Sequence, residues 1–252
     1  MIDKDTAELL LQEARRINNP AFIADDPVQF PRRFTSLPDI EIAALLCASI
    51  AWGNRRMICR NCDRMLALMD NEPYRYVMER GYEDLPDMNI HRTFFAGNLR
   101  HFLRGLHSIY ARHGSLDAFA AHHRVADDPY APWRLVELIN RELAAANQGC
   151  ADSRCLPLNL RTTALKRVNM ALRWLVRRDG IVDLGVWSSL APRQLFIPLD
   201  VHVGDTARQL GLITRRANDR TAAVQLTEAM RTVCPDDPAL MDFALFGIGM
   251  RL

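Results

Sequence analysis

Two residues in the stretch from Arg161 to Gly211 combine the side-chain types that covalent catalysis requires. Lys166 is one of only two lysines among 32 basic residues, the other being Lys4. A lysine amine can lose its proton and act as a nucleophile, whereas an arginine guanidinium cannot. Further along the chain, Asp200 supplies a carboxylate that could stabilise developing positive charge or exchange protons with the amine. We take this pair as a candidate reaction centre.

The lysine is predicted at the start of a helix. The segment RTTALKRVNMALRWLVRRDG has an apolar residue every three or four positions, which predicts a helix capped by Thr162 or Thr163. The positive end of a helix dipole, with Arg161 and Arg167 close by, disfavours another positive charge. These surroundings favour the neutral, nucleophilic form of the Lys166 amine.

Asp200 is predicted to cap a second helix, VHVGDTARQL, which Gly211 ends. Here the dipole and the free backbone N–H groups favour the ionised carboxylate. An ordinary helix cap without a catalytic role is the alternative interpretation of this residue.

The rest of the chain predicts an all-α protein, because no segment shows sustained alternation of apolar and polar residues. Helical patterns occupy residues 5–17, the apolar run IEIAALLCASIAWG after Asp39, and the segments near 54–70, 73–81, 91–113, 115–123, 132–147 and 219–233. A last helix follows Pro238. We expect two helical lobes with a groove between them: residues 36–160 form the middle lobe, and residues 1–35 plus 161–252 form the lobe that carries Lys166 and Asp200.

Charge is concentrated in one part of the chain. The whole chain has a formal net charge of +2, yet the segment from Ser153 to Arg178 contains basic residues and no acidic one. These basic residues are Arg154, Arg161, Lys166, Arg167, Arg173, Arg177 and Arg178. A basic patch suggests a polyanionic partner, and a solvated helix face is the alternative.

Composition argues against several other classes of protein. Six irregularly spaced cysteines in a chain of 252 residues indicate reduced thiols rather than a disulfide framework. Cys59 and Cys62 form a single C-x-x-C without a second pair, so we expect no metal site. No apolar run approaches the length of a membrane span, and we expect a cytoplasmic protein.

The chain also resembles a known superfamily. IPLDVHVGDTARQLGL is similar to the aspartate-bearing segment of the helix-hairpin-helix DNA glycosylases, and TTALKRVNMALRWLVR resembles the helix that opens with their catalytic lysine. IEIAALLCASIAWGNRR and ALMDFALFGIG resemble an early and a late helix of those enzymes, which include endonuclease III and the 8-oxoguanine glycosylases. An uncharacterised bacterial family within or beside this superfamily is more similar still, through DPVQFPRRF, the Lys-Arg-x-Asn-Met helix, PLDVH and DFALFGIG.

The resemblance implies a reaction and a partner. Lys166 matches the lysine that forms a Schiff base and Asp200 the essential aspartate, so the implied activity is excision of a damaged base with abasic-site lyase activity. The partner would be double-stranded DNA with a damaged or flipped base. A monomer associated with the nucleoid is expected, without a cofactor and without an iron–sulfur cluster, since only Cys234 follows the aspartate.

The resemblance and the local chemistry also suggest DNA contacts. Leu160-Arg161-Thr162-Thr163 replaces the glycine turn that usually precedes the lysine, and Arg161, Thr162, Thr163 and Arg167 are candidate phosphate contacts. Trp52 is a candidate wedge for the space left by a flipped base, or else a core tryptophan. His202 is a candidate auxiliary residue, or else a structural one.

Two other functions remain open. The protein could bind DNA on the same fold without turnover, or it could be an enzyme that acts on another nucleic-acid or nucleotide substrate, because a fold does not fix a chemistry.

Overall fold

The computed structural model of this protein describes residues 2–251, and these residues are mostly helical. Helix accounts for 62% of residues and strand for 3%, which agrees with the predicted all-α class. The strands described form one antiparallel hairpin, β1 (Asn89–His91) and β2 (Phe94–Phe95). This hairpin replaces the start of the helix predicted from residue 91. Across residues 2–251 every helix is too short or too polar to traverse a lipid bilayer.

The chain divides into two compact units. We call Met1–Ala24, Asn159–Val186 and Leu190–Leu252 the terminal unit, and Asp25–Leu158 with Trp187–Ser189 the middle unit. Residues 25–35 group with the middle helices, whereas the sequence had assigned them to the other lobe. Both Lys166 and Asp200 belong to the terminal unit.

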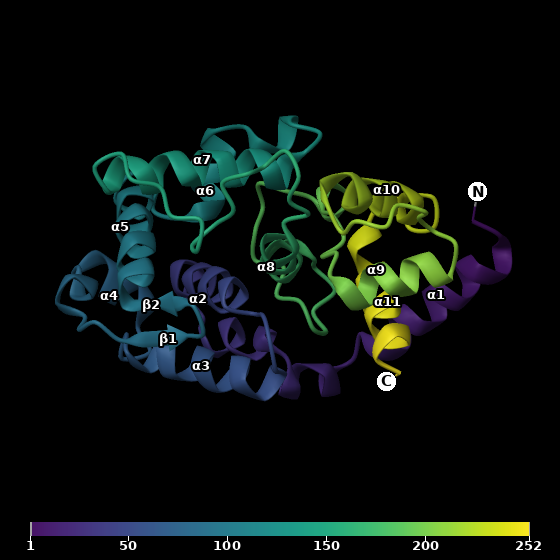
Figure 1. The fold of residues 1–252 in the computed structure, drawn as a ribbon, viewed down its shortest axis with the longest axis horizontal. Coiled ribbons are helices and arrows are strands. Elements are labelled where there is room, and N and C mark those ends of the chain that lie inside the picture. Colours follow the sequence, from purple (N-terminus) through teal and green to yellow (C-terminus); the bar gives the residue numbers. More distant parts are fainter. Residues whose placement is uncertain (1, 252) are drawn as a thin grey trace. The chain divides into compact units, whose positions relative to one another are not determined.

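The terminal unit is built around a helix that is apolar except for Asp242 in its first turn. This helix, α11 (Met241–Met250), packs against α1 (Lys4–Ile17) and α9 (Val201–Gln209) (Figure 1). A Cβ on Gly249 would lie 2.6 Å from Thr206 Oγ1 of α9, and one on Gly247 would lie 2.6 Å from Ile17 Cγ1 of α1. The two glycines therefore permit the close packing of three helices. The remaining elements are α8 (Lys166–Val176), α10 (Arg220–Arg231) and the 3₁₀ turns Pro192–Gln194 and Pro238–Leu240.

The middle unit surrounds the buried helix α2 (Leu37–Ser49). The other helices are α3 (Arg55–Ala67), α4 (Pro73–Met78), α5 (Ala96–His113), α6 (Leu116–His122) and α7 (Ala131–Ala146), and α5 packs against α4, α6 and α7 (Figure 1). Short 3₁₀ turns of this unit are η4 (Gly81–Asp84), Val125–Asp127 and two before α2, at Pro27–Gln29 and Pro31–Arg33. A further 3₁₀ turn, Pro20–Asp25, ends where the terminal unit passes into the middle unit.

Asp39, which directly precedes the apolar run and is a favoured residue type for a helix cap, is not the N-cap of α2. Ser36 is the N-cap, and its hydroxyl accepts a hydrogen bond from the Asp39 N–H. Asp39 lies in the first turn instead, where its Oδ1 accepts a hydrogen bond of 2.8 Å from the backbone N–H of Tyr74 at the start of α4. A partner distant in sequence thus changed the role of a residue that suits a cap.

Glu41 places a carboxyl group inside the apolar helix α2. Its Oε2 accepts hydrogen bonds from the Tyr110 hydroxyl (3.0 Å) and the Leu116 N–H (2.8 Å), and its Oε1 accepts one from the Asp117 N–H (2.8 Å). Burial raises the pKa of Glu41 to about 7, although these three hydrogen bonds act in the opposite direction. The side chain joins α2 and α5 to the start of α6.

We expect Glu41→Gln to lower the free energy of unfolding by about 1–3 kcal/mol, because an amide NH₂ cannot accept a backbone N–H and would leave a buried donor unpaired. Chemical denaturation measures this change. Glu8→Gln, at an exposed position of α1, is the matched control and should change stability by less than about 0.5 kcal/mol.

The loss of stability caused by Glu41→Gln should depend on pH. Since the folded-state pKa of Glu41 is about 7 and its ordinary value is 4.5, the stability gained on protonation is fully present below 4.5 and is lost as the pH rises through 7. The difference between wild type and Glu41→Gln should therefore be about 2–3 kcal/mol larger at pH 5 than at pH 8. An equal difference at both pH values would contradict the assignment.

Candidate active site

The structure brings Lys166 and Asp200 together in the terminal unit. Lys166 Nζ lies 3.9 Å from Asp200 Oδ2, and the side chains are 29% and 27% exposed. This distance allows electrostatic attraction but is too long for a hydrogen bond, so the aspartate does not hold the amine through one. A nucleophile and a carboxylate thus lie side by side, within reach of a ligand from solvent.

Lys166 is the first residue of α8, and the predicted threonine cap was wrong. The residue before the helix is Leu165, which has a left-handed φ of 54° and makes no capping hydrogen bond through its side chain. Both threonines are engaged with the start of α10: the Thr162 carbonyl accepts a 2.8 Å hydrogen bond from the Arg220 N–H, and Thr163 forms an antiparallel bridge with Asp219. The helix therefore begins after this bridge, directly at the lysine.

The two carboxylate oxygens of Asp200 have different surroundings. Oδ1 accepts a hydrogen bond of 3.0 Å from the Val203 N–H and caps α9, as the sequence predicted. Oδ2 is the oxygen nearest to Lys166. The backbone carbonyl of Asp200 accepts hydrogen bonds from the Gly204 N–H (2.9 Å) and Asn218 Nδ2 (3.1 Å). The cap therefore fixes the carboxylate and leaves its second oxygen directed toward the amine.

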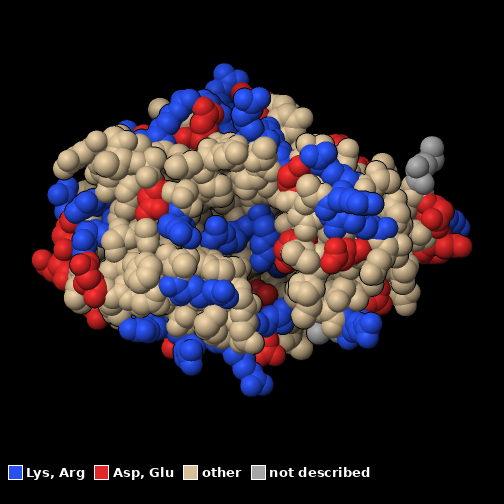
Figure 2. Space-filling model, viewed as in Figure 1, with Lys and Arg blue, Asp and Glu red and all other residues tan. Residues whose placement is uncertain are grey.

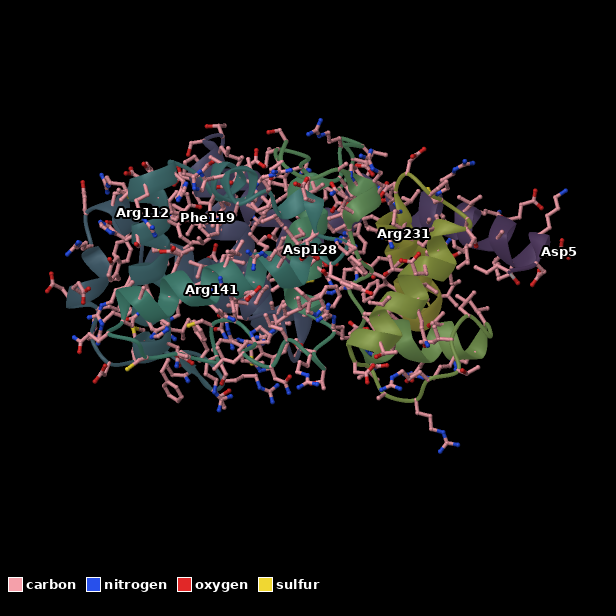
Figure 3. The ribbon with its side chains drawn as sticks, turned by 90° about the horizontal axis from the view of Figure 1, so that it is seen from above. Asp5, Arg112, Phe119, Asp128, Arg141 and Arg231 are labelled. Atoms are coloured by element: carbon pink, nitrogen blue, oxygen red, sulfur yellow. The ribbon has the colours of Figure 1, made fainter. Side chains whose placement is uncertain are left out.

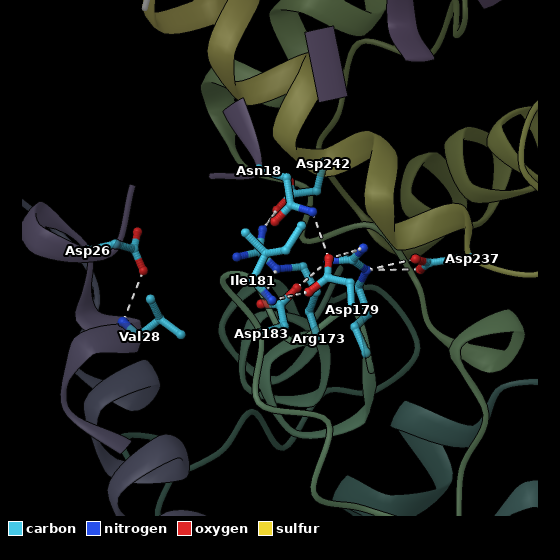
Figure 4. Close-up of polar contacts among 10 residues, drawn as sticks. Asn18, Asp26, Val28, Arg173, Asp179, Ile181, Asp183, Asp237 and Asp242 are labelled. Carbon is cyan, nitrogen blue, oxygen red and sulfur yellow. Dashed lines mark hydrogen bonds and ion pairs between the residues drawn. The ribbon is translucent and has the colours of Figure 1, made fainter. Parts of the chain in front are cut away.

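Two of the basic residues predicted on the surface are buried. The side chains of Arg173 and Arg177 are only 4% and 2% exposed, and both pair with Asp183, which is 0% exposed. Further ion pairs join them to Asp179, Asp237 and Asp242 (Figure 4). We call these six residues the buried arginine network.

This network removes part of the predicted basic patch. Arg161 and Arg178 remain exposed and Arg167 is partly buried, where burial lowers the pKa of its guanidinium. On the face drawn in Figure 2, acidic and basic side chains are interspersed. A charge count along the sequence therefore overstated the basic surface, because it cannot detect charges that are neutralised by buried partners.

Asp242 is a residue of the site that the sequence did not indicate. It lies in the first turn of α11 and pairs with Arg173. Burial and the charge of Asp200 raise the pKa of Asp242 to about 6, while Arg173 and Lys166 act in the opposite direction. Asp242 is thus electrostatically coupled to both members of the pair. A carboxylate in the otherwise apolar run ALMDFALFGIG was the available clue, since a charge in such a run requires a buried partner.

The other candidate residues lie as follows. Arg161, Thr162 and His202 are exposed, and Thr163 is partly buried. Trp52 belongs to the middle unit, where its ring makes an edge contact with His91 at 4.6 Å between centroids. The Trp52 carbonyl lies 2.9 Å from His91 Nε2, so both the ring and the backbone of Trp52 contact His91 within the middle unit. Within the described residues, no three His, Cys, Asp or Glu side chains form a group that could hold a metal ion.

Comparison with known proteins identifies a family. Residues 26–251 match a family described as protein of unknown function (DUF2400). The chain belongs to the DUF2400 family. Its matched range includes α8, α9 and α11, which carry the site, and leaves out α1. No curated protein and no solved structure matches the chain.

Titration of Asp242 tests the coupling within this DUF2400 site. Because the Asp200 carboxylate raises the pKa of Asp242 and the Lys166 amine lowers it, Asp200→Asn should lower this pKa and Lys166→Ala should raise it. Carboxyl ¹³C NMR follows the titration, and the signal is assigned by its loss in Asp242→Asn. Asp205→Asn, an exposed position on α9, should leave the titration unchanged. A pKa that is the same in all variants would mean that Asp242 is not coupled to the pair.

Proposed function

We propose that this protein is a DNA repair glycosylase with abasic-site lyase activity and a helix-hairpin-helix glycosylase-like fold. The observation that carries the proposal is the 3.9 Å separation between Lys166 Nζ and Asp200 Oδ2, with both side chains partly exposed. The two residues that the resemblance pairs as nucleophile and carboxylate lie at the starts of α8 and α9. Its partner in this proposal is double-stranded DNA with a damaged or flipped base.

The reaction would begin at the sugar of a nucleotide flipped out of the duplex. The neutral Lys166 amine attacks C1′, the bond from C1′ to the base breaks, and the base leaves with the bonding electrons. The Asp200 carboxylate stabilises the positive charge that develops on the sugar. Opening of the sugar ring yields a Schiff base on Lys166, and loss of a C2′ proton then expels the 3′ phosphate.

Two features of the site support these roles. The cap made by Asp200 Oδ1 holds the carboxylate before a substrate arrives, and such preorganisation is the main source of electrostatic stabilisation in enzymes. The exposed Arg161 and Thr162 lie on the segment leading to α8, where they could contact DNA phosphate, with Thr163 and Arg167 as further candidates. The wedge role of Trp52, an auxiliary role of His202, a monomeric state and association with the nucleoid belong to the same proposal.

Borohydride trapping on abasic-site DNA tests the proposed nucleophile. Wild type should form a covalent protein–DNA adduct on reduction, and Lys166→Ala should lose it, because the reducible imine requires this amine. Lys4→Ala removes the other lysine of the chain and should trap as wild type does. An adduct of equal yield in Lys166→Ala would disprove the assignment. If DNA binds but neither trapping nor base release occurs with a panel of lesions, the chain is a binding protein on the same fold.

The salt dependence of DNA binding tests the phosphate contact separately. The affinity for DNA should fall as the salt concentration rises, because protein binding releases the cations that are condensed on the DNA. Arg161→Ala removes one phosphate contact and should therefore reduce the slope of log K against the logarithm of the salt concentration by about one. Fluorescence anisotropy with a duplex measures the slope. Arg15→Ala, an exposed arginine on α1, serves as the control and should leave it unchanged. A wild-type affinity that does not respond to salt would exclude nucleic acid as the partner.

A further inference from the structure

The middle unit contains a cavity of about 850 Å³ that the proposed reaction does not use. Its wall is formed by one face of α5, the turn before η4 and the end of α7. Pockets of this size typically hold small organic ligands, a mononucleotide being of suitable dimensions.

The wall along α5 is a continuous polar row. His101, Arg104, His107, Ser108 and Arg112 recur at helical spacing and all line the cavity (Arg112 is labelled in Figure 3). The opposite face of the same helix is buried and apolar, with Leu99, Phe102, Leu103, Leu106 and Ile109. Because the apolar face anchors the helix, the polar row is held rigidly toward the cavity.

The lining carries an excess of positive charge. Two of its four arginines are balanced by carboxylates, since Arg104 pairs with Glu83 and Arg112 with Glu142. Arg100 donates hydrogen bonds to the carbonyls of Leu85 (2.7 Å) and Tyr82 (3.3 Å), and it forms an ion pair at 3.7 Å with Asp87, whose side chain is 95% exposed.

The fourth arginine is Arg80, whose charge contributes to the lowered pKa of Glu83 without an ion-pair contact. Among residues 2–251 no carboxylate lies within ion-pair distance of Arg80, whose Nε contacts His107 Nε2 at 3.5 Å. Arg80 has a left-handed φ of 58°, and a Cβ on the following Gly81 would lie 2.7 Å from the Tyr76 ring. The tight turn packed on Tyr76 therefore fixes the backbone of Arg80, whose side chain is exposed.

His101 adds an unsatisfied polar atom to the wall. Its Nε2 is buried without a hydrogen-bond partner among the described residues, and burial lowers the pKa of this histidine. Because Nε2 is shielded from solvent, a ligand in the cavity would contact other polar groups of the wall. Asn147, Gln148 and Ser108 provide further uncharged polar groups around it.

From these features we propose that the cavity binds a small phosphorylated molecule, of about the size of a mononucleotide. Arg80 and Arg100 come from different segments, so they can approach different oxygens of one anion. A phosphate or diphosphate offers several such oxygens, whereas a single carboxylate would satisfy only one guanidinium fork. The cavity is concave and its cations lie within it, which suits a compact ligand better than the convex backbone of a duplex.

The experiment uses the full-length protein with pyrophosphate and AMP as probes in separate calorimetric titrations. At least one probe should bind, and Arg80→Gln should weaken that binding by about tenfold or more, because it removes a charge-assisted contact. Gly97→Leu should abolish binding by filling space. Gly97 lines the cavity, and a Cβ there meets no atom within 4 Å, so a leucine can be added without a clash with the fold. Arg124→Gln, a charge control outside the cavity, should bind as wild type does.

Three results would overturn the proposal. The first is no binding of either probe to the wild type, and the second is equal binding to all variants; in both cases the cavity is not the site. The third is displacement of the probe by a DNA duplex that itself loses affinity in Arg80→Gln and Gly97→Leu, which would make the cavity a contact for the DNA backbone instead. Lys166→Ala should keep wild-type affinity for the probe, so this test does not depend on the glycosylase proposal.

Discussion

The terminal unit depends on the pairing of two buried cations, Arg173 on α8 and Arg177 at the C-cap of this helix. An arginine removed from water without a partner would cost several kcal/mol, so Arg173 and Arg177 each require carboxylates at fixed positions. Those carboxylates come from the loop after α8, from the turn before α11 and from α11 itself. Arg173 also lies over the Phe243 ring at 4.2 Å, which adds a cation–π contact. The buried arginine network therefore fixes the position of α8 relative to α11.

This constraint sets the spacing of the lysine–aspartate pair. Lys166 lies two helical turns before Arg173 on α8, and Arg173 is bound to Asp242 at the start of α11. Gly249 of α11 packs against α9, the helix that Asp200 caps. Lys166 and Asp200 are thus connected through a third helix rather than by a hydrogen bond to each other. The amine donates a hydrogen bond to Met170 Sδ at 3.7 Å and remains partly exposed, while the neighbouring carboxylate is held by its cap.

Sequence patterns predicted those parts of the site that depend on contacts between residues close together in the chain. Asp200 caps α9 as expected, because the cap is made with a backbone N–H three residues away. The threonine cap failed because Thr163 pairs with Asp219, far along the chain. Arg173 was assigned to the surface because its partner Asp242 lies 69 residues away. Sequence patterns identify the lysine and the aspartate, but the partners of buried charges depend on tertiary structure.

Under the proposed function, the cations of the segment around Lys166 must meet two conflicting requirements, which explains one lysine among arginines. Holding DNA phosphate requires a cation that stays charged, whereas attack on a sugar requires an amine that can be neutral. Arginine satisfies the first requirement at every physiological pH, and only lysine can satisfy the second. Asp242, with a pKa raised to about 6 by burial, adds a group whose charge changes within the physiological range. Protonation of Asp242 would leave Lys166 and Arg173 with one carboxylate charge fewer, so the site would become more positive and bind phosphate more strongly. The local balance of charge, rather than the total basic content of the segment, would then determine how this site engages DNA.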